Sequence, residues 1–123
     1  MDESGQHGLV CSKRDQSKES PWNAGADIYC LANKNGAFSG EMNTLLIIAK
    51  QGHGNGQWYA AKACHLLQIC EAGKTYGDWY LPSVFELDLM YESKAIIDAT
   101  SLKNGGSPFA NDFYWSSSEY GNN

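Results

Sequence analysis

The sequence predicts a single α+β domain made of short strands, two or three helices and long loops. Three observations support this fold class. A turn, a short apolar stretch and a helix start follow one another within residues 76–87. Residues 40–50 and 57–70 carry apolar side chains at helical spacing. The chain also has 13 glycines with 4 tryptophans, 7 tyrosines and 4 phenylalanines in 123 residues, which is typical of loops pinned by aromatic packing.

Residues 76–87 hold the clearest local signal. Gly77 and Asp78 form a turn pair, and the bulky residues 79–81 favour a short strand. Pro82 then disfavours helical geometry in the residue before it.

A capping box follows at Ser83 and Glu86, because a serine N-cap is followed three residues later by a glutamate. We therefore expect a helix over residues 84–94. Its inner face would carry Val84, Leu87, Met90 and Tyr91.

Two further helices are predicted before this one. Residues 40–50 place Leu45, Ile48 and Ala49 on one face, with Glu41 in the first turn. Residues 57–70 form a longer helix closed by Gly73 as the residue after the C-cap. The apolar stripe of this second helix consists of Tyr59, Ala60, Ala63, Cys64, Leu67 and Cys70.

The predicted strands lie in the outer parts of the chain. Residues 9–11, 26–31 and 113–119 are short apolar or aromatic stretches bounded by turn signals. Residues 33–36 and 103–108 are predicted loops. Because a turn signal follows the strand at 113–119 directly, we expect the domain to lack its last strands in this chain.

The formal net charge of −5 disfavours a general nucleic-acid-binding protein, which needs a basic face. The longest apolar run, residues 45–49, is far too short to span a membrane. The first residues, Met-Asp-Glu, are acidic and do not resemble a signal peptide.

The four cysteines, Cys11, Cys30, Cys64 and Cys70, leave three states open. They are core thiols, members of one or two disulfides, or metal ligands. The lack of a Cys-x-x-Cys pair makes a structural zinc site the weakest of the three. We expect no metal centre.

The most promising functional surface is the aromatic and polar segment 111–120. Flat rings beside amide, carboxylate and hydroxyl groups suit a sugar- or protein-binding face. The alternative is that Tyr114 and Trp115 belong to the core, although alternation turns only one of the two inward. The candidate ligand-binding residues are Asn111, Asp112, Tyr114, Ser117, Glu119 and Tyr120.

No cofactor and no catalytic site are expected. The serines at 116–118 lack the Gly-x-Ser-x-Gly pattern of a nucleophile elbow, and no HExxH motif is present. Calcium is the one ion that the loop composition leaves open, because it prefers carboxylate and amide oxygens. Those oxygens come from Asp98, Asn104, Asn111, Asp112 and Glu119.

Several motifs, in the same order, resemble the C-terminal domain family of the Legionella collagen-like adhesin. The resemblance covers nearly the whole chain. The motifs are Ser-Gly-Gln-His-Gly-Leu-Val at 4–10, Phe-Ser-Gly-Glu-Met-Asn-Thr at 38–44, Ala-Ala-Lys-Ala-Cys at 60–64, Tyr-Gly-Asp-Trp-Tyr-Leu-Pro-Ser at 76–83 with Glu86-Leu87, and Tyr-Trp-Ser-Ser-Ser-Glu at 114–119.

This resemblance implies a C-type-lectin-like fold, a homotrimer on the cell surface or outside the cell, and binding of sulfated glycosaminoglycan-type polysaccharides. For such a ligand the early basic residues Lys13, Arg14 and Lys18 are the candidate contacts, gathered three times over in a trimer. Trp79, Pro82 and Trp115 would then be structural, with both tryptophans in one shared interior.

Related variable proteins of diversity-generating retroelements share the motif pattern, so a protein-binding display domain is the alternative function. An enzyme of the formylglycine-generating type, related by fold, is a more distant alternative and would need a reactive cysteine pair in a cleft. The family continues beyond the Tyr-Trp-Ser-Ser motif, which is a second reason to expect missing strands here.

Overall fold

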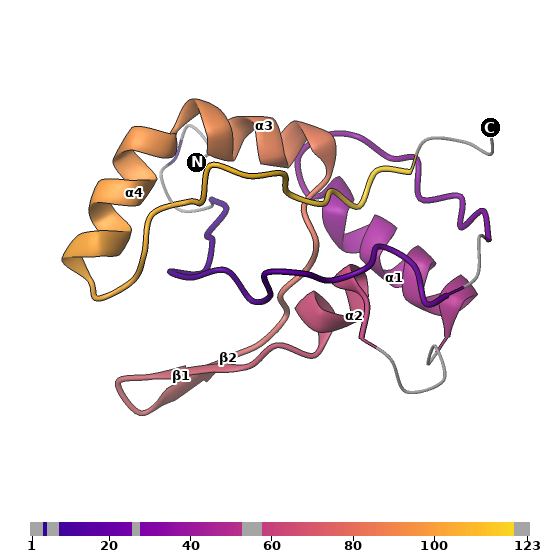
Figure 1. Ribbon diagram of the computed structural model, residues 1–123, viewed down its shortest axis with the longest axis horizontal. Coiled ribbons are helices and arrows are strands. Elements are labelled where there is room, and N and C mark those ends of the chain that lie inside the picture. The colour runs from indigo at the N-terminus through magenta and orange to yellow at the C-terminus, as the bar shows by residue number, and fades with distance from the viewer. Residues whose placement is uncertain (1–3, 5–7, 26–27, 53–57, 120–123) are drawn as a thin grey trace.

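The computed structural model describes residues 4, 8–25, 28–52 and 58–119. It shows an α+β architecture, as the sequence predicts, with helices and one antiparallel hairpin joined by long loops (Figure 1). The hairpin projects away from the helices. In chain order the elements of the described part are α1 (Ser39–Gln51), α2 (Ala60–His65), β1 (Ile69–Glu71), β2 (Lys74–Tyr76), α3 (Val84–Glu92) and α4 (Lys94–Lys103).

Helix α1 confirms the prediction for residues 40–50, but a different face is buried. The buried residues are Gly40, Asn43, Thr44, Ile47 and Gln51, whereas Leu45 is 46% exposed. The buried polar groups find partners in loops, since the Thr44 hydroxyl accepts the Leu81 N–H at 3.0 Å. The sequence prediction relies on a stripe of apolar residues, so it does not find a helix face that is buried because its polar side chains bond to loops.

The core lies at the end of the molecule formed by α1 and α2. Trp22, Ala24, Leu46, Ile48 and Cys64 pack against it from the outside. Its members are small apart from one ring and two branched side chains: Cys30, Ala32, Ile47, Tyr59, Ala60, Ala61 and Leu81.

The predicted helix over residues 57–70 is wrong beyond His65. Residues 69–71 instead pair with 74–76, with Ile69 opposite Tyr76 and Cys70 opposite Thr75. Gly73 has φ +77° and Ala72 φ +51°, the two consecutive left-handed residues that a tight hairpin turn requires. The glycine therefore turns a hairpin rather than ending a helix.

The capping box of α3 is confirmed in full. The Ser83 hydroxyl accepts the Glu86 N–H, and the Glu86 carboxylate accepts the Ser83 N–H at 3.1 Å. The helix ends at Glu92, and α4 starts after Ser93, so the expected end at residue 94 is two residues late. Tyr91 is 76% exposed, which corrects its assignment to an inner face.

The strands predicted at 9–11, 79–81 and 113–119 do not form, and neither does the described part of 26–31. Instead, the chain around 13–22 runs beside the chain around 107–116 (Figure 1). Tryptophan and tyrosine side chains provide most of the cross-links that a strand ladder would otherwise provide. The bonds join Ser107 N to Lys13 O, Tyr114 Oη to the Asp15 carboxylate, Trp115 Nε1 to Ser20 O, and Trp22 Nε1 to Ser116 O.

The expectation that Trp79 and Trp115 share one interior is wrong. Trp115 is 54% exposed, and its indole N–H bonds Ser20 O at 2.7 Å. Trp79 is half-buried and bonds Tyr76 O at 3.0 Å. The tryptophan that packs on the core is Trp22.

The chain exposes 8819 Å² of surface, whereas a compact monomer of 13.5 kDa would expose about 6500 Å². Within the described residues, every helix is too short or too polar to cross a lipid bilayer.

Candidate functional site

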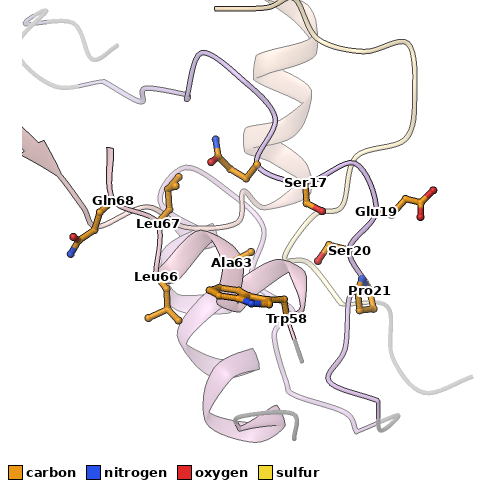
Figure 2. Close-up of a pocket in the computed structure, with 10 residues that line it drawn as sticks. Ser17, Glu19, Ser20, Pro21, Trp58, Ala63, Leu66, Leu67 and Gln68 are labelled. Carbon is orange, nitrogen blue, oxygen red and sulfur yellow. The ribbon is translucent and has the colours of Figure 1, made fainter. Parts of the chain in front are cut away.

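A hollow of about 480 Å³ lies between residues 16–21 and residues 58–68 (Figure 2). We call it the Trp58 groove. The indole of Trp58 is 58% exposed and provides its main flat apolar surface. Its lining also includes Gln16, Ser17, Ser20, Leu66 and Gln68.

The Trp58 groove contains a polar atom without a partner. The hydroxyl oxygen of Ser20 is buried and makes no hydrogen bond. Figure 2 shows it pointing toward the side of the hollow on which Trp58 and Ala63 lie, whereas Glu19 points away. A buried hydroxyl without a partner costs about 1–3 kcal/mol, so this position favours a ligand that supplies one.

Positive charge lies beside the same ring. The Lys62 ammonium lies 5.6 Å from the centroid of the Trp58 ring, within the range of a cation–π contact. Lys18 is exposed and stands in the chain between the lining residues Ser17 and Glu19. The groove therefore combines a ring with amide and hydroxyl groups. Lys62 contacts that ring and Lys18 lies between two lining residues in the chain, although neither lysine is itself part of the lining.

The other two predicted basic contacts are engaged in the fold. Lys13 is half-buried, pairs with Glu71, and donates to Asn104 O at 3.1 Å. Arg14 donates to Gly105 O at 2.7 Å. Both cations thus bind carbonyls after the C-terminal end of α4, where the helix dipole favours positive charge.

A second hollow of about 280 Å³ lies between α3 and residues 109–114. We call it the α3 groove. It brings together three of the residues predicted from sequence, Asn111, Asp112 and Tyr114. Tyr114 packs edge-on against Phe109 at 5.7 Å, and its hydroxyl accepts the Ala110 N–H at 2.8 Å. Burial, with Asp15 and Asp112 nearby, raises the pKa of Tyr114.

Two of the remaining predicted residues, Ser117 and Glu119, do not join these two sites. Ser117 is fully buried, and its backbone N–H bonds Pro82 O at 2.7 Å. The Glu119 carboxylate accepts the N–H of Cys30 at 2.8 Å, which holds the loop before α1. These two residues are therefore structural. Tyr120 lies outside the described residues.

The cysteines are free thiols rather than disulfides. Burial raises the pKa of Cys11 and Cys30, and it raises the pKa of Cys64 to about 11. Catalytic thiols need the opposite shift.

Among the described residues, no group of three or more His, Cys, Asp and Glu side chains is placed to hold a metal. Two of the candidate calcium ligands are used elsewhere. Asp98 accepts the Phe109 N–H at 2.8 Å, and the Asn104 amide donates to Thr100 O at 2.8 Å.

Sequence reasoning missed Trp58, although a signal was present. The apolar stripe starts at Tyr59 and leaves Trp58 outside it, which indicates an exposed ring. The contribution of Ser20 depends on how two distant segments meet, so no local pattern could predict it.

No protein-family model matches this chain, and the searches of curated proteins and of solved structures give no significant match.

Proposed function

We propose that this chain is a non-enzymatic adhesion module of a bacterial surface or secreted protein, with a C-type-lectin-like ancestry, that binds a sulfated polysaccharide in the Trp58 groove. The observation that supports it most is the exposed Trp58 ring with the Lys62 ammonium 5.6 Å from its centroid, beside the unpartnered Ser20 hydroxyl. The motif resemblance to the adhesin domain family supports the same ligand class.

Each part of the groove matches one part of such a ligand. The apolar C–H face of a sugar ring stacks on the Trp58 indole. A sugar hydroxyl fills the position opposite Ser20 Oγ, and the Gln68 amide provides both a donor and an acceptor. Gln16 provides its side-chain oxygen as an acceptor, because its NH2 group already donates to Ser12 Oγ and Arg14 O. Lys62 and Lys18 then meet the sulfate groups.

A homotrimer is a further part of the proposal, and the motif resemblance implies it. A homotrimer would present three Trp58 grooves to one polymer, which raises the avidity without a new contact. Size measurement by light scattering tests this part separately.

Retention on heparin–agarose tests the ligand class. We expect retention that falls with salt, because polyanion binding releases counterions. Trp58→Ala and Lys62→Gln should elute at clearly lower salt. Lys50→Gln removes the same charge at the exposed end of α1 and is the matched control. Passage of the native protein through the column at low salt would remove the proposal.

A protein-binding display domain is the second candidate. It is favoured by the exposed loop 109–115, in which Phe113 is 100% exposed and Trp115 54% exposed. The genomic neighbourhood discriminates the two, because a retroelement-diversified protein has a template repeat of its variable segment nearby.

A further inference from the structure

The α3 groove differs in chemistry from the Trp58 groove. Its walls carry aromatic rings, of which Tyr91 is 76% exposed and Phe113 fully exposed. Exposed rings gathered around a hollow indicate a surface that a partner covers, whereas single apolar residues scattered over a surface do not indicate a binding site. Phe109 and Tyr114 provide the fixed part of the wall through their edge-to-face contact.

The charge of the α3 groove is negative. Asp88 and Asp112 line it, and Asp15 bonds the hydroxyl of the lining residue Tyr114 at 3.0 Å. In the part of the chain that the structure describes, Lys94 is the one basic residue in its wall, and its charge is offset by the ion pair with Asp98. A sulfated chain is therefore repelled here, and a cation is attracted.

Lys94 also shows which contact the groove favours. Its ammonium lies 5.9 Å from the centroid of the Phe109 ring while a carboxylate pairs with it. A ring face together with a carboxylate is the environment that binds alkylammonium and guanidinium groups. The exposed rings of Tyr91 and Phe113, with Asp88 and Asp112, offer the same combination to an incoming cation.

We propose that the α3 groove binds lysine and arginine side chains of an extended basic segment of a partner protein. The aliphatic stems of those side chains pack on Leu87 and Met90, and their charged ends reach the rings and the carboxylates. This inference is independent of the proposed polysaccharide function.

Fluorescence anisotropy with a labelled octapeptide of alternating lysine and glycine tests the inference at low salt. We expect saturable binding that weakens as salt rises, and no binding of the peptide with glutamate in place of lysine. The double variant Asp88→Asn with Asp112→Asn should lose at least tenfold in affinity, and Phe113→Ala about fivefold. Asp78→Asn removes an exposed charge outside the groove and should change nothing.

Three results would overturn the inference. They are absence of lysine-peptide binding, undiminished binding by the double variant, and tighter binding of a fully deacetylated glucosamine tetramer, which would assign the groove to a cationic polysaccharide. Amide NMR shifts of the native protein on adding the peptide provide a readout that needs no variant, and they must centre on residues 88–91 and 109–114. Heparin retention of the double variant should not fall, because the variant removes only negative charge. This result separates a failure of the present inference from a failure of the polysaccharide function.

Discussion

The carboxylate of Glu86 accepts the backbone N–H of Gly40 at 2.8 Å, so the capping residue of α3 also lies at the start of α1. The same oxygen accepts the Ser83 N–H at 3.1 Å. One negative group thus meets the positive ends of two helix dipoles. The other oxygen accepts the Tyr80 hydroxyl at 2.5 Å, and burial together with this bond raises the pKa of Tyr80.

Removal of this carboxylate should destabilise the fold. Glu86→Ala leaves two buried N–H groups and one hydroxyl without acceptors, so we expect the free energy of unfolding to fall by about 3 kcal/mol. Glu86→Gln keeps an acceptor but loses the charge, and should cost about 1 kcal/mol. Urea unfolding measures both. Glu92→Gln, at the exposed end of α3, is the control and should stay within about 0.5 kcal/mol of the native protein.

Gly40 should tolerate no side chain. A Cβ there would lie 2.6 Å from Glu86 Oε1 and 2.6 Å from the Leu81 carbonyl oxygen. Gly40→Ala should therefore cost about 2 kcal/mol of unfolding free energy, although alanine is the better helix former. Gly77→Ala meets no atom within 4 Å and should be nearly neutral. Equal stability of the two variants would contradict this account of how α1 and α3 meet.

The sequence predicts the local signals well and the distant ones poorly. The Ser83–Glu86 capping box and the extent of α1 follow from residues a few positions apart. The second bond of Glu86, to Gly40, crosses 46 positions of chain and has no local signature. Residues 69–76 illustrate the same limit, because pairing across the Ala72–Gly73 turn overrides an apolar stripe that indicates a helix.

The candidate site residues show the same contrast between local signals, which the sequence predicts, and distant contacts, which it does not. Asn111, Asp112 and Tyr114 are close in sequence and do line one groove. Lys13 and Arg14 are close to Lys18 in the sequence, yet both donate hydrogen bonds to backbone carbonyls that follow α4. Composition shows which residues carry charge, whereas tertiary contacts decide which charges remain available to a ligand.

The thiols should differ in reactivity in the native protein. Cys70 is exposed, whereas burial raises the pKa of Cys64 to about 11. Since the thiolate is the reactive form, an aromatic disulfide reagent at pH 8 should modify Cys70 at least tenfold faster than Cys64. Peptide mapping by mass spectrometry assigns the rates. In urea the two rates should converge, and equal rates in the native protein would contradict the buried position of Cys64.

The same shift predicts a loss of stability in alkali. The pKa of Cys64 is higher folded than its ordinary value of 9.0, so its contribution is complete below pH 9 and is lost as the pH rises toward about 11. Urea midpoints of the native protein and of Cys64→Ala should therefore converge between pH 9 and 11. A constant difference across that range would assign the alkaline loss to other groups.

The loss of folding stability at low pH should depend on Asp98. Its carboxylate pairs with Lys94 and accepts the Phe109 N–H at 2.8 Å, so it connects α4 with the wall of the α3 groove. The Lys94 ammonium and this N–H hold the pKa of Asp98 below its ordinary value of 3.8.

A carboxyl with a lowered folded pKa stabilises the fold above its ordinary pKa, and this contribution disappears as the pH falls through the folded value. Asp98→Asn should thus be less stable than the native protein at pH 7, and the difference should shrink as the pH falls below 3.8. Thermal unfolding across this range measures the difference. Asp78→Asn, at an exposed turn position, should follow the native curve, and an Asp98→Asn curve that stays parallel to the native one would show that the ion pair does not contribute.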